Sequence, residues 1–419
     1  MRAERIDRGV TMFGWSTGRV RIVALSGALL AGTVVTVTGA PSAAADGPGV
    51  GTPFVVSVGD SAISGEAGRW AGNTNVSPGN VDAGGADAYF DNAANTGEQI
   101  AGCHRSESAA IHIGGGIGSL NLACSGAKTA TGGGGGSDFK PGIDFYNGPY
   151  GKGQALALQE FASTNNVKMV SVLIGANDYG FADILQTCFL NWYLSPSWWP
   201  NYCNDDSGIR SRFTASNIAA KTTAIKGALL NIRQAMANAG YADSSYTIMA
   251  HTYWSPIPSG SGNRYPQTGY SRQTVGGCGM WNRDADWANN TVVPTFNSSV
   301  RNAVTQTGLS NIKVLDLQSS LNGRRLCENT VGLLEEKGVA SWTAAGAVDK
   351  TEWVNQLRTT STVFGPYQVQ ESVHANHWGQ MAMRSCMRQA YNGGTPRGGS
   401  CVRSANGLNP QGEPNMALQ

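Results

Sequence analysis

Three side chains that together suit acyl-transfer chemistry lie in or just after distinct segments of the sequence. Ser61 comes after the apolar residues 54–58, Asn177 follows the apolar run 167–174, and His374 lies in a polar segment near the C-terminus. A serine hydroxyl becomes a strong nucleophile only when a base such as an imidazole takes its proton. The attacked carbonyl becomes an oxyanion, which needs N–H donors already in place. These residue types predict a nucleophile, a base and an amide donor at one site.

Four short blocks around these residues occur in the order found in one enzyme family. They are VSVGDSAISGEAGRW at 56–70, LACSGA at 122–127, IGANDYG at 174–180 and ESVHANHWGQ at 371–380. With these blocks the chain resembles the SGNH, or GDSL-type, hydrolases, in particular the secreted actinobacterial esterases and lipases. A single Gly-Asp-Ser occurs by chance, whereas four blocks in family order, each at an expected element end, are specific.

The resemblance implies a role for each matched residue. Ser61 would be the nucleophile and His374 the base. Gly126, Asn177 and the backbone N–H of Ser61 would form the oxyanion hole, since glycine suits a close approach of the backbone to a ligand. Ser61, Gly126 and Asn177 could otherwise belong to ordinary turns. The reaction would pass through an acyl-enzyme, and no metal or cofactor is expected.

Other polar residues near these blocks are expected to have structural roles. Asp60 and Asp178 resemble family residues that shape their loops, so we expect hydrogen bonds from both. His377 lies one helical turn beyond His374 and is expected at the rim of the site or in solvent. His251 ends a predicted strand and is expected to be a hydrogen-bonded histidine of the core or rim.

The acid that would orient His374 is where the chain departs from the family pattern. The family commonly has an aspartate three residues before the histidine, and here that position is Glu371. Some triads use glutamate, so Glu371 is the first candidate. Some secreted actinobacterial relatives instead use a backbone carbonyl two residues before the histidine, which here belongs to Ser372.

An aromatic segment follows the Asn177 block and could set the substrate. Residues 188–203 contain six aromatic side chains, with Trp198 and Trp199 adjacent to each other. Because the segment leaves the carboxyl end of a predicted strand, Trp198 and Trp199 are expected to bind substrate, as part of a rim for acyl chains or lipid. The alternative is a cluster of side chains packed under the loop.

Hydrophobic periodicity predicts the elements that would position these residues. Apolar runs typical of buried strands occur at 54–58, 167–174, 246–250 and 312–317. Apolar residues repeat every three or four positions from 218 to 236, which indicates an amphipathic helix ended by Gly240, and a last helix is expected at 376–391. This alternation favours a parallel sheet covered by helices, with ligands at the carboxyl ends of the strands. The resemblance implies a three-layer α/β/α sandwich, the flavodoxin-like SGNH hydrolase fold with long disulfide-stapled loops.

Residues 1–45 have the order of a secretory signal peptide. A leader with five arginines precedes the apolar residues 22–40, and small residues at 42–45 predict cleavage after Ala45. The alternative is a membrane anchor, although Gly, Ser and Thr weaken the apolar run. We expect one hydrolase domain at 46–401, and a loose polar tail at 402–419.

The charge balance excludes one class of partner. The whole chain has a net charge of +2, and the leader carries five arginines against two acidic residues, so the mature chain has a charge of about −1. No basic excess remains for a nucleic acid. The 56 glycines show no three-residue period, which excludes a collagen-like chain.

The cysteines indicate an oxidising compartment. The eight cysteines form an even set, all after the leader: Cys103, Cys124, Cys188, Cys203, Cys278, Cys327, Cys386 and Cys401. An even number in an exported chain predicts four disulfides, of which pairing in sequence order is the simplest of about 105 arrangements. A zinc site is disfavoured because no C-x-x-C pair occurs.

The sequence therefore predicts a secreted, extracellular serine esterase or lipase that acts on lipid or other acyl esters. A phospholipase, an acyltransferase and a carbohydrate acetyl esterase could use the same residues, and a carbohydrate-binding module is the non-catalytic alternative. An ester is the expected partner, with no nucleic acid and no membrane span after cleavage of the leader. The oligomeric state is open, with a monomer as the simpler expectation.

Overall fold

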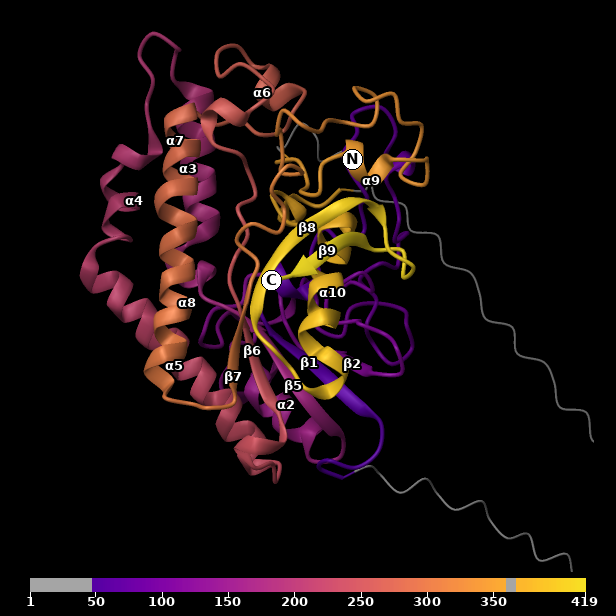
Figure 1. Cartoon of the computed structure of the whole chain (residues 1–419). Coiled ribbons are helices and arrows are strands. Elements are labelled where there is room, and N and C mark those ends of the chain that lie inside the picture. The colour runs from indigo at the N-terminus through magenta and orange to yellow at the C-terminus, as the bar shows by residue number, and fades with distance from the viewer. Residues whose placement is uncertain (1–46, 359–366) are drawn as a thin grey trace, which may run out of the picture. The chain divides into compact units, whose positions relative to one another are not determined.

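The computed structural model of the chain describes residues 47–358 and 367–419 (Figure 1). Ala45–Gln419 forms one compact unit. The predicted signal peptide at 1–45 lies outside the described residues. Within the ranges described, no helix is long and apolar enough to cross a membrane.

A parallel sheet forms the centre of this unit. The first five of its seven strands are parallel and have the spatial order β2 (Gly118–Asn121), β1 (Pro53–Gly59), β5 (Asn166–Leu173), β6 (Thr247–His251) and β7 (Ile312–Asp316). Numbered along the chain, this is the 2-1-3-4-5 order of flavodoxin-like folds. The valines of β1 are fully buried, because a sheet covered on both faces buries both sides of each strand. The four strands predicted from apolar runs are confirmed.

Helices cover both faces of the sheet (Figure 1). The four longest are α3 (Phe181–Leu194), α5 (Ala215–Asn238), α8 (Val293–Thr307) and α10 (His377–Tyr391). Helix α5 packs against α8 and against α2 (Gln154–Ala162) on one face, and α10 lies on the other. The buried face of α5 includes Ile225, Leu229 and Ile232, which confirms the helix predicted around 218–236.

Short elements occupy the long connections. The shorter helices are α1 (Ser61–Ser64), α4 (Ser207–Ser211), α6 (Ser271–Thr274), α7 (Asn282–Trp287) and α9 (Ala347–Lys350). The strands β3 (Asn147–Gly148) and β4 (Gly151–Lys152) form a separate hairpin. The connections that leave the carboxyl ends of β1, β2, β5, β6 and β7 all contribute residues to the site.

The prediction of a loose tail at 402–419 is wrong, because residues 399–418 form a β-hairpin. Strand β8 (Gly399–Leu408) pairs in parallel with β7, and β9 (Pro414–Leu418) pairs antiparallel with β8. Pro414, Met416 and Leu418 are buried, whereas Asn415 and Ala417 between them are half-buried. This alternation fits a half-buried strand that packs on α10. Polar residues and prolines concealed the pattern in the sequence.

Four disulfides link the cysteines in sequence order. The pairs are Cys103–Cys124, Cys188–Cys203, Cys278–Cys327 and Cys386–Cys401. The simplest of the possible pairings is therefore confirmed. The closed loops span 15 to 49 residues, and cross-links of this size restrict the unfolded chain substantially. Three of the bonds tie long connections, and the fourth ties α10 to β8.

Candidate active site

Ser61 is placed by the sharp turn that follows β1. Gly59 ends the strand with φ of +142°, and a side chain there would collide with the carbonyl oxygen of Leu173 on β5. Asp60 then caps α1 by accepting a hydrogen bond from the backbone N–H of Ala62 at 3.0 Å. The turn leaves Ser61 as the first residue of α1, at the carboxyl edge of the sheet.

His374 lies against Ser61. Its Nε2 is 2.7 Å from the Ser61 hydroxyl oxygen, and its Nδ1 is 3.0 Å from the backbone carbonyl oxygen of Ser372. Because a carbonyl oxygen can only accept, Nδ1 carries the ring proton and Nε2 is the acceptor for the serine hydroxyl. This is the tautomer that a base for Ser61 requires.

A constrained backbone holds His374 in this orientation. The preceding residue, Val373, has φ of +63°, a conformation that is strained for a β-branched side chain. Asn355 fixes the backbone of Val373 and His374 with two hydrogen bonds. Its N–H donates to the carbonyl of His374, and its carbonyl accepts from the N–H of Val373. The turn directs the Ser372 carbonyl toward the imidazole.

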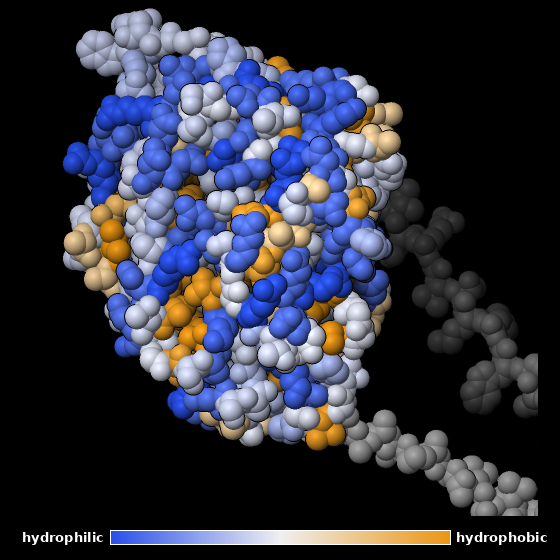
Figure 2. All heavy atoms as spheres, in the orientation of Figure 1, coloured by the Kyte–Doolittle hydropathy of each residue, from blue (hydrophilic) through white to orange (hydrophobic). Residues whose placement is uncertain are grey.

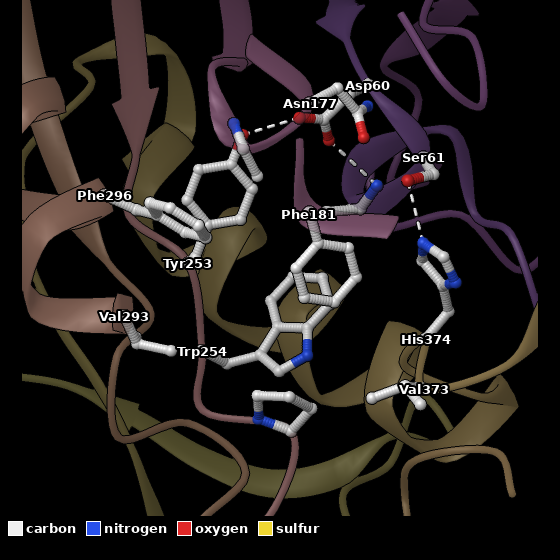
Figure 3. A pocket seen from close by; sticks show the side chains of 13 residues that line it. Asp60, Ser61, Asn177, Phe181, Tyr253, Trp254, Val293, Phe296, Val373 and His374 are labelled. Carbon is white, nitrogen blue, oxygen red and sulfur yellow. Dashed lines mark hydrogen bonds between the residues drawn. The ribbon is translucent and has the colours of Figure 1, made fainter. Parts of the chain in front are cut away.

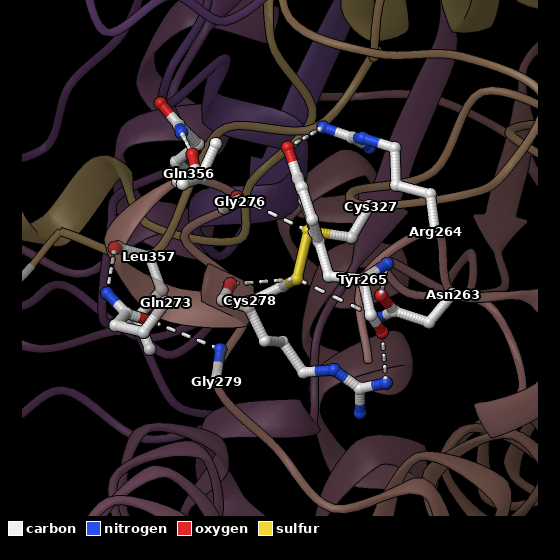
Figure 4. The surroundings of a disulfide bond; sticks show 12 residues. Asn263, Arg264, Tyr265, Gln273, Gly276, Cys278, Gly279, Cys327, Gln356 and Leu357 are labelled. Carbon is white, nitrogen blue, oxygen red and sulfur yellow. Dashed lines mark hydrogen bonds between the residues drawn. A yellow bond between two sulfur atoms is a disulfide. The ribbon is translucent and has the colours of Figure 1, made fainter. Parts of the chain in front are cut away.

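The segment that contains Asn355 is itself braced by a disulfide. Cys278–Cys327 lies beside it (Figure 4). Next to the bond, the N–H of Leu357 donates to the carbonyl of Gly277 at 2.7 Å, and the side chain of Gln273 donates to the carbonyl of Leu357 at 3.0 Å. The cross-link thus supports the chain on which His374 depends.

The carboxylate of Glu371 makes no hydrogen bond to the imidazole of His374, which contradicts the expectation that it orients the ring. Its carboxylate is buried and accepts from the indole N–H of Trp70 at 2.8 Å, the hydroxyl of Tyr89 at 2.6 Å and the N–H of Gln368 at 2.9 Å. Burial raises the pKa of Glu371 above its usual value, against the opposing hydrogen bond from Tyr89. Glu371 therefore ties three segments together, and the alternative, the Ser372 carbonyl, occupies the orienting position.

The expected oxyanion donors line the same cavity as Ser61 and His374. Gly126 has φ of +77°, which favours glycine, and its N–H has no acceptor among the described residues. Asn177 donates one side-chain N–H to the carbonyl of Ala127 at 2.9 Å, so the amide has a second hydrogen to offer. The N–H of Ser61 is at the first position of a helix, where no intrahelical acceptor exists.

Glu66 is a buried carboxylate at the site that the sequence analysis did not single out. Its Oε2 lies 3.6 Å from Nε2 of His374 and accepts from the hydroxyl of Ser125 at 2.5 Å. Its Oε1 is 3.0 Å from Nδ1 of His104. Burial would raise the pKa of Glu66, but the charge of His374 and the hydrogen bond with His104 outweigh it and lower the pKa. The residue lies in the first motif block, yet nothing in its spacing distinguishes it from a turn residue.

Two cavities meet at Ser61. The smaller, of about 50 Å³, is enclosed mainly by apolar and aromatic side chains, including Tyr253, Trp254 and Phe296 (Figure 3). The larger, of about 630 Å³, runs past Gly126 and is lined on one side by α3. Phe181, Asn177 and His374 line both cavities. Ser61 therefore lies between a narrow apolar cavity and a wide one.

Trp198 and Trp199, expected at the rim for the acyl chain, line neither cavity. Both residues are exposed, at 80% and 73% of their surface. The apolar wall of the larger cavity comes instead from Phe189 and Leu190, which lie earlier in the same segment, on α3. The alternative of a cluster packed beneath the loop does not describe the two tryptophans either.

The remaining polar residues have structural contacts. Asp178 accepts from the N–H and the hydroxyl of Thr129, at 3.1 Å and 2.7 Å. Asp60 accepts from the hydroxyl of Tyr253 at 2.5 Å, and burial raises its pKa to about 7. His251 is buried against the hydroxyl of Ser171 at 2.6 Å, as expected. His377 begins α10 and is half-buried, with its ring packed against Trp342 and Trp378.

Comparisons with known proteins found similar folds but no similar sequence. No protein-family model and no curated protein matches the chain. An extracellular lipase from Streptomyces rimosus is 16% identical, with 82% of this chain and 100% of that chain covered and a TM-score of 0.41. Phospholipase A1 from Streptomyces albidoflavus NA297 is 18% identical over 79% and 95% of the two chains, with a TM-score of 0.40. A family two carbohydrate esterase from Clostridium thermocellum is 11% identical over 81% and 63%, with a TM-score of 0.33. These values transfer no residue role and no substrate to this chain.

Proposed function

We propose that this chain is a secreted serine ester hydrolase of the SGNH type. The observation that carries the proposal is the contact of 2.7 Å between the Ser61 hydroxyl and Nε2 of His374, on a cavity that also contains Gly126 and Asn177. The four motif blocks that carry the family resemblance supply these four residues. A nucleophile, a base and separate N–H donors are the components that acyl transfer needs.

The mechanism follows from this arrangement. Ser61 attacks the ester carbonyl carbon while its proton passes to Nε2 of His374. The N–H groups of Ser61, Gly126 and Asn177 stabilise the resulting oxyanion. His374 returns the proton to the leaving alcohol as the ester C–O bond breaks, which leaves an acyl-enzyme on Ser61. Water, deprotonated by His374, then attacks the acyl-enzyme, and the carboxylic acid is released as Ser61 recovers its proton.

In this proposal the Ser372 carbonyl, and not a carboxylate, orients the base. It accepts the Nδ1 hydrogen at 3.0 Å and so keeps Nε2 free to accept the proton of Ser61. A carbonyl dipole also favours the imidazolium that forms in the transition state, although less strongly than a full negative charge would. Val373 contributes by fixing the direction of this carbonyl.

The cavities favour an ester with an apolar acyl group. The larger cavity has apolar side chains from α3 along one wall, including Phe181, Leu185 and Phe189. Burial of alkyl surface there would favour binding by about 0.8 kcal/mol for each methylene group. An acetyl ester would leave most of this volume unused, so the cavity favours a lipase or acyl esterase over a carbohydrate acetyl esterase.

Export is part of the same proposal. The predicted signal peptide and the four disulfides both suit an oxidising compartment. The disulfides brace loops around the site, so the active enzyme would require oxidation of its cysteines after export.

Hydrolysis of p-nitrophenyl esters with acyl chains of increasing length tests the function. We expect kcat/KM to rise with chain length, and Ser61→Ala or His374→Ala to lower kcat by several orders of magnitude. Ser163→Ala, an exposed serine before β5, is the matched control and should retain full activity. Unchanged activity in Ser61→Ala would refute the proposal, and so would a wild-type protein that hydrolyses no ester.

A further inference from the structure

The loop after α3 concentrates exposed apolar side chains in one place. Of the thirteen large apolar residues that are exposed in the described part of the chain, five fall between positions 190 and 199. We define the apolar tip as Tyr193, Leu194, Trp198 and Trp199, of which the last three are more than 70% exposed. Exposed apolar groups of this kind mark interaction sites, whereas single ones are ordinary.

The apolar tip is built to project and to remain uncharged. In Figures 1 and 2 the loop extends away from the compact unit at the upper left, and its surface in Figure 2 is pale instead of blue. The disulfide Cys188–Cys203 closes its base. Residues 189–202 contain no Asp, Glu, Lys or Arg, so the tip offers no charge to an ionic partner.

The apolar tip is continuous with the cavity that contains Ser61. Helix α3 starts at Phe181, next to the catalytic loop, and its apolar side chains at 181, 185, 189 and 190 line the larger cavity. Tyr193 stacks on Phe189, with ring centroids 5.6 Å apart, and so extends this lining to the tip. A helix of this length spans about 20 Å. An unbroken apolar face therefore connects the exposed tip with the nucleophile.

We propose that the apolar tip inserts into an uncharged or zwitterionic lipid surface and holds the mouth of the larger cavity against it. The inference rests on the proposed function and names the physical state of its substrate. Indole and phenol rings suit the boundary between lipid and water, because they combine an apolar body with a polar edge. Leucines beside them add aliphatic surface, which favours acyl chains over the polar hydroxyls of a polysaccharide.

The test measures binding and catalysis separately. In a Ser61→Ala background, which prevents hydrolysis, the Trp198→Ala/Trp199→Ala variant should bind phosphatidylcholine vesicles at least about tenfold more weakly in a sedimentation assay. Binding of the parent should change little with salt, since no charge is involved. In the active background the same variant should lose activity on vesicle or emulsion substrate, with kcat/KM on p-nitrophenyl acetate unchanged.

Tyr150→Ala is the matched control, because Tyr150 is exposed by 55% but lies outside the tip and both cavities. It should bind vesicles like the parent. Equal vesicle binding by the double variant would overturn the proposal, as would binding only to anionic vesicles. A dimer that the double variant dissociates, or retention on a polysaccharide without vesicle binding, would assign the tip to another partner. Vesicle binding that depends on the tip, in a protein without esterase activity, would refute the proposed function alone.

Discussion

At the scale of single residues, the candidate site combines an imidazole whose Nδ1 donates to a backbone carbonyl with two buried carboxylates, Glu66 and Glu371. The sequence predicts that His374 lies beside Ser61, because both residues belong to motif blocks of one family. The contacts of Glu371 could not be predicted, because its spacing from His374 does not show which way its side chain points. A left-handed turn at Val373 points the Ser372 carbonyl to the imidazole and leads Glu371 away. A valine in that conformation cannot be predicted from its residue type.

The first prediction concerns Glu371. Glu371→Gln should change kcat/KM by less than about tenfold, because its carboxylate does not touch His374, whereas loss of a true triad acid costs about 10⁴-fold. It should lower Tm, since a buried acceptor of hydrogen bonds from Trp70 and Tyr89 is altered. Ester kinetics and calorimetry on one preparation check both. A loss of several orders of magnitude in kcat with an unchanged Tm would restore Glu371 as the catalytic acid.

The second prediction concerns Glu66. Its carboxylate lies 3.6 Å from Nε2 of His374, where a negative charge favours the imidazolium formed during attack. Glu66→Gln keeps the size and the acceptor for Ser125, and we expect kcat to fall about tenfold or more with KM nearly unchanged.

The control for Glu66 is Ser125→Ala, which removes their hydrogen bond but keeps the charge. It should lower kcat less than Glu66→Gln does. Equal losses in both variants would mean that Glu66 only positions the loop before Gly126. A faster Glu66→Gln enzyme would mean that the charge opposes the oxyanion.

At the scale of elements, the parts of the fold with strong hydrophobic periodicity were predictable and the others were not. The buried valine run of β1 is typical of a strand, and the apolar repeat of α5 is typical of an amphipathic helix. The hairpin at 399–418 was missed because its outer face is polar and its first strand contacts the sheet through two residues. The short strand β2 was missed because Gly118–Asn121 contains one large apolar residue.

The third prediction tests the hairpin. Deletion of residues 409–419 removes β9, including the buried side chains of Met416 and Leu418. Burial of two such side chains contributes about 3–6 kcal/mol, so Tm should fall markedly, while activity on a soluble ester well below Tm should persist. Thermal denaturation compares the truncated chain with Arg403→Ala, which alters an exposed position of β8. Equal Tm values for the truncated and full-length chains would show that the hairpin does not stabilise the fold.

At the scale of the whole molecule, buried histidines link folding to pH. Burial lowers the pKa of His112 to about 4, that of His251 to about 3 and that of His377 to about 4. The folded state keeps these rings neutral, whereas the unfolded chain binds protons below about 6.5. Their contribution to stability is therefore present above pH 6.5 and is lost as the pH falls toward 4.

The fourth prediction follows from the direction of these pKa shifts. Tm should decrease between pH 7 and pH 4, and His251→Gln should reduce that decrease. Asp60 acts in the opposite direction, because its raised pKa of about 7 makes its contribution largest below 3.8 and lost as the pH rises through 7. Asp60→Asn should therefore make the acid loss steeper. Calorimetry across this range measures both slopes, and identical slopes in the three proteins would contradict the assignment.

The contact between Ser61 and His374 joins residues 313 positions apart in the chain. Neither residue can meet the other until the strands between them have been laid side by side, and contacts of such long range form late and slowly in folding. Hydrolysis is thus a readout of completed folding as well as of chemistry. In a refolding experiment with oxidised cysteines, helix content should recover first and esterase activity last, so a chain trapped without its final strands would be compact, largely helical and inert.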